Sequence, residues 1–195
     1  IVLLLLVVMT CGENIVETSI GKIEGHRLAN NDTILEFLGI PYALPPVGKL
    51  RFKRPKRIGV FSQTFNAQNF GPACVQLKNH HDNDEIRQSE DCLTLNIWTA
   101  VKNIRGNSDA ESGDSDVMEN KLKPVVVQLH GGDLISGSSG DLQDKSRSLV
   151  SNNDFVVVSL NYRLNIFGFL SIKPLSDESP RRVSGNFGVH DCISA

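Results

Sequence analysis

The stretch that decides the fold is VVVQLHGGDLISGSSGDLQDKSRSLVSNNDFVVVSL, from Val125 to Leu160. It begins with VVVQL and ends with FVVVSL, two near-continuous apolar runs of the kind found in strands buried on both faces of a parallel sheet. Residues 141–150, DLQDKSRSLV, are the candidate crossover helix, although their helical pattern is weak. The stretch therefore predicts a right-handed βαβ unit in an α/β architecture.

The segment after the first of these strands, HGGDLISGSSGD (residues 130–141), is the candidate site, because ligands bind beyond the carboxyl ends of strands in α/β sheets. A G-x-G-x-x-G motif is absent, and Ser138 stands where a P-loop has its lysine, so a nucleotide site is not expected. Gly131 and Gly132 carry no Cβ and can expose main-chain N–H groups to a developing oxyanion. A tight turn without chemistry is the alternative.

Composition excludes several classes but selects no function. The chain has 195 residues, of which 40% are hydrophobic and 22% charged, with a net charge of −2. These values are those of a globular domain and exclude collagen-like, coiled-coil and wholly disordered chains. The balanced charge does not indicate a nucleic acid or an anionic membrane as partner.

Both ends of the sequence indicate a truncated chain from the secretory pathway. The apolar run IVLLLLVVM (residues 1–9) is shorter than the roughly 20 residues of a membrane span. We interpret residues 1–12 as a partial signal peptide and the protein as secreted; a buried N-terminal strand is the alternative. At the other end, GNFGVHDCISA stops without a turn or polar tail.

A secreted context favours disulfide and glycan chemistry. Cys74 and Cys92 flank a polar stretch, and a disulfide between them would stabilise the fold by roughly 3 kcal/mol. Asn31 opens a glycosylation triplet, Asn-Asp-Thr, and residues 30–32 also predict a turn between two extended runs, residues 19–27 and 33–40. Those runs predict a β-hairpin or edge meander, and residues 92–98 predict another strand. Residues 103–120 form an acidic surface loop in this interpretation.

Five motifs then occur in order along the chain: GIPYALPPVGKLRF (39–52), EDCLTLNIW (90–98), HGGD (130–133), NYRLNIFGFLS (161–171) and GNFGVHD (185–191). Together they closely resemble the N-terminal part of the type-B carboxylesterases, the cholinesterase-like branch of the α/β-hydrolase fold. The resemblance covers residues 15–195. It implies an incomplete α/β-hydrolase domain, with a β-meander start and a central, mostly parallel sheet joined by crossover helices.

The resemblance also implies roles for individual residues. Gly131, Gly132 and Asp133 match a three-glycine loop whose last two positions supply oxyanion-hole N–H groups. The other matched positions are structural: the disulfide pair Cys74 and Cys92, the salt bridge between Arg51 and Glu90, and the framework residues Arg163 and Asp191.

Three residues depart from the family pattern. Asp133 replaces a glycine, and its carboxylate would oppose a nearby oxyanion unless it is directed away. Asn165 also replaces a glycine, and asparagine is the next best residue where φ is positive. Cys192 replaces a common glutamine, and nothing in the sequence explains that change.

The sequence thus predicts part of a secreted serine carboxylesterase acting on small-molecule esters, with no metal or other cofactor. No G-x-S-x-G occurs, so the nucleophilic serine, the acid and the histidine are expected beyond Ala195, and this fragment alone is expected to be inactive and unstable. A non-catalytic cholinesterase-like adhesion or receptor ectodomain is the alternative. The basic run Lys49–Arg57 is interpreted as a solvated loop rather than a heparin or nucleic-acid patch. His80–Glu85 is likewise interpreted as a polar loop rather than a metal site.

Overall fold

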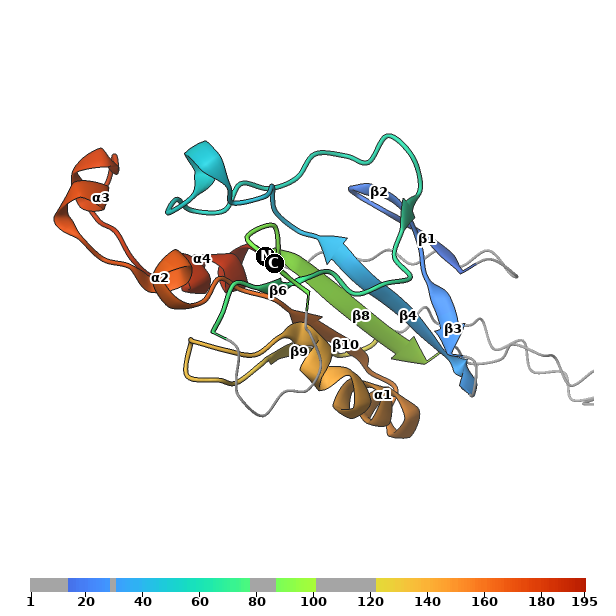
Figure 1. Cartoon of the computed structure of the whole chain (residues 1–195). Coiled ribbons are helices and arrows are strands. Elements are labelled where there is room, and N and C mark those ends of the chain that lie inside the picture. The colour runs from blue at the N-terminus through green and yellow to red at the C-terminus, as the bar shows by residue number, and fades with distance from the viewer. Residues whose placement is uncertain (1–13, 29–30, 78–86, 101–121) are drawn as a thin grey trace, which may run out of the picture.

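The computed structural model describes residues 14–28, 31–77, 87–100 and 122–195, whose elements are shown in Figure 1. The strands are β1 (Ile15–Thr18), β2 (Gly21–Glu24), β3 (His26–Leu28), β4 (Asn31–Pro41), β5 (Phe65–Asn66), β6 (Ala73–Cys74), β7 (Gln88–Ser89), β8 (Thr94–Ala100), β9 (Val125–Leu129) and β10 (Val156–Leu160). The helices are η1 (Gly48–Leu50), η2 (Ser139–Leu142), α1 (Gln143–Asn152), α2 (Asn165–Phe169), α3 (Lys173–Glu178) and α4 (Phe187–Ser194).

The main sheet confirms an α/β architecture. Its strand order is β3-β4-β8-β10-β9. β9 and β10 pair in parallel, with Val125 opposite Val156, as the two apolar runs predict. The other described pairings of this sheet, β3–β4, β4–β8 and β8–β10, are antiparallel. The parallel part of the described sheet is therefore the β9–β10 unit that carries the candidate loop.

The crossover between β9 and β10 contains the expected helix. It starts as η2 and continues as α1, so the helical segment begins two residues before the predicted one and ends two residues after it. Asp141 accepts hydrogen bonds from the Ser138 N–H and hydroxyl, both at 2.8 Å, which satisfies a main-chain donor at the start of the helical segment. α1 covers one face of the sheet (Figure 1).

The sheet has an apolar core on each face because side chains alternate along a strand. On the α1 face, Ile34, Trp98 and Val157 are buried together with Val150 of the helix. On the opposite face, Leu35 and Phe37 alternate with those residues and join a larger core that includes the disulfide cysteines. The core on the α1 face is thus the smaller of the two. The core on the opposite face includes side chains of the N-terminal strands β1 and β2.

The N-terminal residues form short antiparallel pairs, as expected for a hairpin or meander. β1 pairs with β2 through a turn at Ile20, and β3 pairs with β4 with a register shift after Arg27. The proline-rich segment after β4 is extended, except for the single turn of η1.

One strand departs from the expected burial. Val125, Val127 and Leu129 of β9 are 54%, 59% and 52% exposed, whereas full burial on both faces was expected. The reason is topological. β9 is the edge strand of the described sheet, and α1 packs against the face that carries Val126, not against the face that carries these three side chains. None of the described helices is both long and apolar enough for a membrane span.

Candidate active site

The candidate site is the turn that leaves the carboxyl end of β9. Its backbone has positive φ at three successive residues, 111° at Gly132, 53° at Asp133 and 63° at Leu134. A Cβ on Gly132 would overlap the Ser136 carbonyl oxygen, so this position requires glycine, whereas a Cβ on Gly131 would meet nothing within 4 Å. Asp133 fits because aspartate tolerates the left-handed region better than most residues.

The carbonyl groups of this turn are engaged, which fixes the direction of its amides. His130 Nδ1 is 2.9 Å from the Gly131 oxygen, and the Gly132 oxygen accepts from the N–H groups of Ile135 (2.9 Å) and Ser136 (3.0 Å). A planar trans peptide points its N–H opposite to its C=O. The N–H groups of Gly132 and Asp133 are therefore directed away from these partners.

None of the N–H groups of Gly131, Gly132 and Asp133 makes a hydrogen bond with another described residue. Successive unpaired amides in such a turn form an anion-binding concavity. The arrangement can stabilise a negative oxygen at the end of β9 by hydrogen bonding alone. The side chain of Asp133 is exposed, so its carboxylate has access to solvent.

His130 forms the base of the turn. Its ring stacks on Tyr162 with centroids 4.5 Å apart, and the Tyr162 hydroxyl donates to the His130 carbonyl oxygen at 3.0 Å. Burial lowers the pKa of His130, so the ring is neutral at pH 7 and Nδ1 is able to donate to Gly131 in one tautomer. The histidine thus orients the turn.

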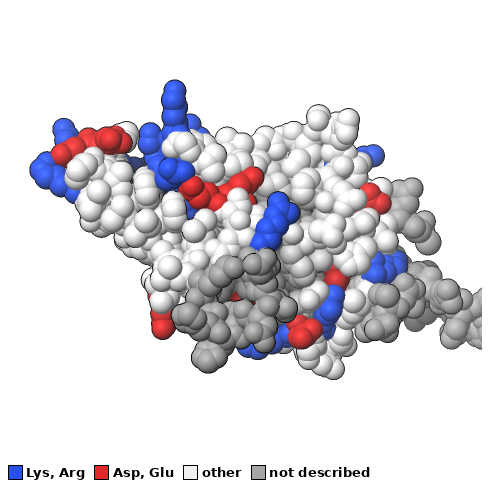
Figure 2. Space-filling view, viewed as in Figure 1, with Lys and Arg blue, Asp and Glu red and all other residues white. Residues whose placement is uncertain are grey.

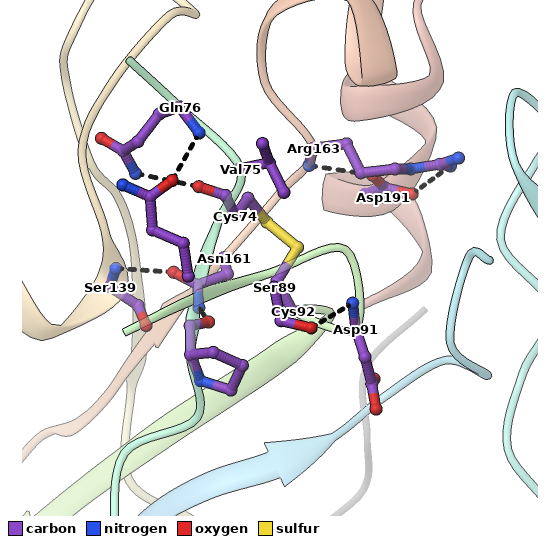
Figure 3. Close-up of a disulfide and its surroundings, with 12 residues drawn as sticks. Cys74, Val75, Gln76, Ser89, Asp91, Cys92, Ser139, Asn161, Arg163 and Asp191 are labelled. Atoms are coloured by element: carbon purple, nitrogen blue, oxygen red, sulfur yellow. Dashed lines mark hydrogen bonds and ion pairs between the residues drawn. A yellow bond between two sulfur atoms is a disulfide. The ribbon is translucent and has the colours of Figure 1, made fainter. Parts of the chain in front are cut away.

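A buried polar network holds the start of η2 beneath the turn. Asn161 Oδ1 accepts from the Ser139 N–H at 2.8 Å (Figure 3). Asn96 Nδ2 donates to the hydroxyls of Ser139 (2.9 Å) and Ser159 (3.0 Å). Sequence reasoning missed these side chains. Asn161 belongs to the NYR motif and Asn96 to the strand motif, but neither position by itself indicates its partner.

The segment that contains the disulfide lies against the same turn. Cys74 and Cys92 form the predicted disulfide, which Figure 3 shows between the Asn161–Ser139 hydrogen bond and the Arg163–Asp191 ion pair. Two residues after Cys74, the amide side chain of Gln76 hydrogen-bonds both main-chain groups of Gly137. Gln76 was not predicted as a site residue.

Asn165 confirms the expected left-handed conformation, with φ of 51°. It also adds contacts that a glycine could not supply. Its Nδ2 donates to the carbonyl oxygens of Ile135 (2.9 Å) and Val75 (3.3 Å). Its main-chain N–H, which a glycine would also have, donates to the Leu134 oxygen at 2.9 Å. The substitution therefore ties the turn after β9 to the disulfide segment.

Arg51 and Glu90 form the predicted salt bridge at a distance from the turn. The Nε–Oε2 and Nη2–Oε1 distances are 2.6 and 2.5 Å, and the hydrogen bond to Glu90 raises the pKa of Arg51. The flanking basic side chains protrude at the surface above η1 (Figure 2). The pair joins the basic segment to the residues just before Cys92.

Several predicted features lie wholly or partly outside the described residues. These are the partial signal peptide (1–12), the acidic loop (103–120) and His80–Glu85. The backbone of Asn31 begins β4, but its side chain is not described, so its glycosylation stays a prediction. Among the residues that are described, no three His, Cys, Asp or Glu side chains gather in a metal-binding group.

The chain is similar in sequence to a known protein family and to several of its members. A family model described as the carboxylesterase family matches residues 12–195. Acetylcholinesterase-1 of Trittame loki is 37% identical over 188 residues, which cover 93% of this chain and 30% of that protein. Fumonisin B1 esterase of Sphingopyxis macrogoltabida is 35% identical, with coverages of 91% and 29%. Neuroligin-2 of Mus musculus is 34% identical, with coverages of 93% and 24%.

Solved structures agree with the fold. A PNB esterase superposes with a TM-score of 0.74 at 32% sequence identity, covering 93% of this chain and 33% of that structure. A carboxylesterase of Geobacillus stearothermophilus superposes with a TM-score of 0.71 at 31% identity. The chain thus spans about a quarter to a third of the length of the curated relatives it matches.

Proposed function

The chain belongs to the carboxylesterase family, and on that premise we propose that it is the N-terminal part of a secreted serine carboxylesterase. In this proposal the complete protein hydrolyses carboxylic esters through an acyl-enzyme. The observation that carries the proposal is the turn after β9, whose amides at Gly131, Gly132 and Asp133 have no partner among the described residues. Esterases among its relatives support the same reaction class.

The turn acts on the oxygen of the scissile carbonyl. When a serine hydroxyl adds to the ester carbon, the carbonyl oxygen gains negative charge, and preorganised N–H donors lower the energy of that state. The donors at Gly132 and Asp133 are preorganised because their peptide carbonyls are held by His130, Ile135 and Ser136. Removal of one such donor in a serine hydrolase slows the reaction by roughly 100- to 1,000-fold.

The remaining chemistry belongs to residues outside this chain. A histidine removes the serine proton and then protonates the leaving alcohol, which departs as the acyl-enzyme forms. Water repeats the attack on the acyl-enzyme, releases the carboxylic acid and restores the serine. No residue of this chain takes part in proton transfer in the proposed mechanism. Secretion is proposed from the apolar residues 1–9.

A second candidate function is a non-catalytic member of the family. Asp133 favours it, because a carboxylate on the same residue as an oxyanion donor opposes negative charge near that donor. The similarity to neuroligin-2, a relative that is not named as an esterase, also supports this candidate.

Expression of the complete protein in a secretory host distinguishes the two. An esterase turns over p-nitrophenyl acetate and is labelled stoichiometrically by a fluorophosphonate, and labelling is lost when the nucleophilic serine is replaced by alanine. A folded, secreted protein that shows neither turnover nor labelling contradicts the esterase and supports the non-catalytic member.

A further inference from the structure

Gln76 makes a two-point contact with the candidate site. Its Oε1 accepts from the Gly137 N–H at 2.8 Å, and its Nε2 donates to the Gly137 carbonyl oxygen at 2.9 Å. The two residues are 61 positions apart in the chain. A carboxamide is the side chain that can satisfy a main-chain donor and a main-chain acceptor together, because it carries one group of each kind.

Gln76 is itself held in place. Its N–H donates to Gln88 Oε1 at 2.9 Å, and its Nε2 also donates to the Cys74 carbonyl oxygen at 3.0 Å. Cys74 is joined to Cys92 by the disulfide (Figure 3), and β6, which contains Cys74, pairs with β7. The side chain therefore extends from a covalently fixed segment rather than from a free loop.

Gly137 links the Gln76 side chain to the amides of the turn. Its φ is 104°, and a Cβ added there would lie 2.5 Å from both the Gly131 carbonyl oxygen and His130 Nδ1. The backbone of Gly137 is thus packed directly on the hydrogen bond that orients the Gly131–Gly132 peptide. A shift of Gly137 would move that peptide.

We propose that Gln76 is a positioning residue for this site, and that the Cys74–Cys92 disulfide supports catalysis through it. The proposal rests on the function proposed above. Gln76 does not touch substrate; it fixes Gly137, Gly137 fixes the Gly131 carbonyl, and the Gly132 N–H is thereby aimed at the oxyanion. Asn165 supports the same segment from Val75, since its amide bridges Val75 and Ile135.

A misaligned donor stabilises the transition state less well but changes the binding of the ester little, because the full negative charge exists only in the transition state. Loss of the Gln76 contact should therefore lower kcat and leave KM nearly unchanged. Positioning errors of about 1 Å reduce rates by up to about 100-fold.

The test uses the complete protein with Gln76→Ala and Gln76→Glu. Active sites are titrated with a fluorophosphonate, and kcat, KM and the affinity for a trifluoromethyl ketone, which forms a tetrahedral oxyanion, are measured. In Gln76→Ala, kcat per titrated site should fall about 10- to 100-fold, KM should stay within about twofold, and ketone affinity should fall in parallel with kcat. Gln68→Ala is the matched control, because the Gln68 side chain is exposed.

Gln76→Glu tests the donor separately. A carboxylate keeps the acceptor for the Gly137 N–H but loses the donor to the Gly137 carbonyl, and protonation restores that donor. The ratio of its kcat to that of the wild type should therefore rise as pH falls. Gln76→Ala should show no such rise.

The proposal is overturned if Gln76→Ala retains the wild-type kcat per titrated site and ketone affinity, or if only the amount of active protein falls. Failure of the esterase proposal is recognised separately, by a wild-type protein without turnover or labelling. Hydrogen–deuterium exchange then decides the role of Gln76. Faster exchange at residues 131–137 in Gln76→Ala than in Gln68→Ala supports positioning, and equal exchange refutes it.

Discussion

Arg163 and Asp191 form an ion pair that is almost completely buried, with exposed side-chain fractions of 3% and 0%. Arg163 donates from Nε to Oδ2 at 2.8 Å and from Nη2 to Oδ1 at 2.7 Å, and its main-chain N–H also reaches Oδ2 at 3.1 Å. This three-donor contact joins α4 to the segment that follows β10. It confirms that both residues belong to the framework rather than to the turn after β9.

Replacing Asp191 with asparagine should destabilise the complete protein by about 3–5 kcal/mol, because it leaves the buried guanidinium without a counter-charge. Urea unfolding measures the change. Asp177→Asn is the control, since Asp177 pairs with Lys173 and Arg182 at the exposed surface and should change stability by less than about 1 kcal/mol. Equal effects of the two substitutions would contradict the assigned role of burial.

The two glycines of the HGGD turn should respond differently to alanine. At Gly132 an added Cβ overlaps the Ser136 carbonyl and φ is positive, so Gly132→Ala should distort the turn and cost more than about 1 kcal/mol of stability. At Gly131 the Cβ position is open, so Gly131→Ala should fold with near wild-type stability. Thermal unfolding of both variants checks this, and a larger loss in Gly131→Ala would show that the turn is built differently.

Stability should decrease as pH falls below about 6.5. Burial lowers the pKa of His130, and burial together with Arg54 lowers the pKa of His190. The unfolded chain, with an ordinary histidine pKa near 6.5, then binds more protons than the folded chain, so acid favours unfolding. The loss begins near pH 6.5 and ends once pH is below the folded pKa values.

Urea midpoints measured between pH 8 and pH 5 test this pH dependence. His130→Gln should reduce the slope in that window, because the titrating group is gone. An unchanged slope in His130→Gln and in His190→Gln would assign the acid sensitivity to other groups.

Cys192 should be an unreactive thiol in the folded protein. Burial, followed by the negative charge of Asp191, raises its pKa to about 11. Because the thiolate is the nucleophile, only about one molecule in a thousand is reactive at pH 8. Iodoacetamide should therefore label Cys192 slowly in the native protein and rapidly after unfolding in urea. Rapid native labelling would place the thiol at the surface.

The local pattern of the sequence was sufficient for several elements. The β-branched runs at 125–129 and 155–160 predict the parallel β9–β10 pair, and the loop after β9 follows from that topology as the candidate site. The left-handed conformation of Asn165 was also predictable, because few residue types tolerate it. The Cys74–Cys92 pairing followed from spacing and family resemblance together.

Burial and long-range polar contacts were not predictable in this way. Glu36 lies in an apolar strand, yet its carboxylate is fully buried because Trp98 Nε1 and the Arg147 guanidinium donate to it at 2.6–2.9 Å. Nothing near Glu36 in the sequence identifies those donors. Conversely, the apolar side chains of β9 are half exposed because the strand lies at the sheet edge.

The sequence by itself determined the longer strands of the main sheet, at 33–40, 92–98, 125–129 and 155–160, and the loop after β9 as the candidate site. Each of these depends on residue types within a few positions of one another. Only the tertiary structure decided that Gln76 holds Gly137 and that Asn161 holds Ser139. Periodicity and turn preferences are local, whereas a hydrogen bond between residues 61 positions apart exists only once the sheet has brought both segments to the same edge.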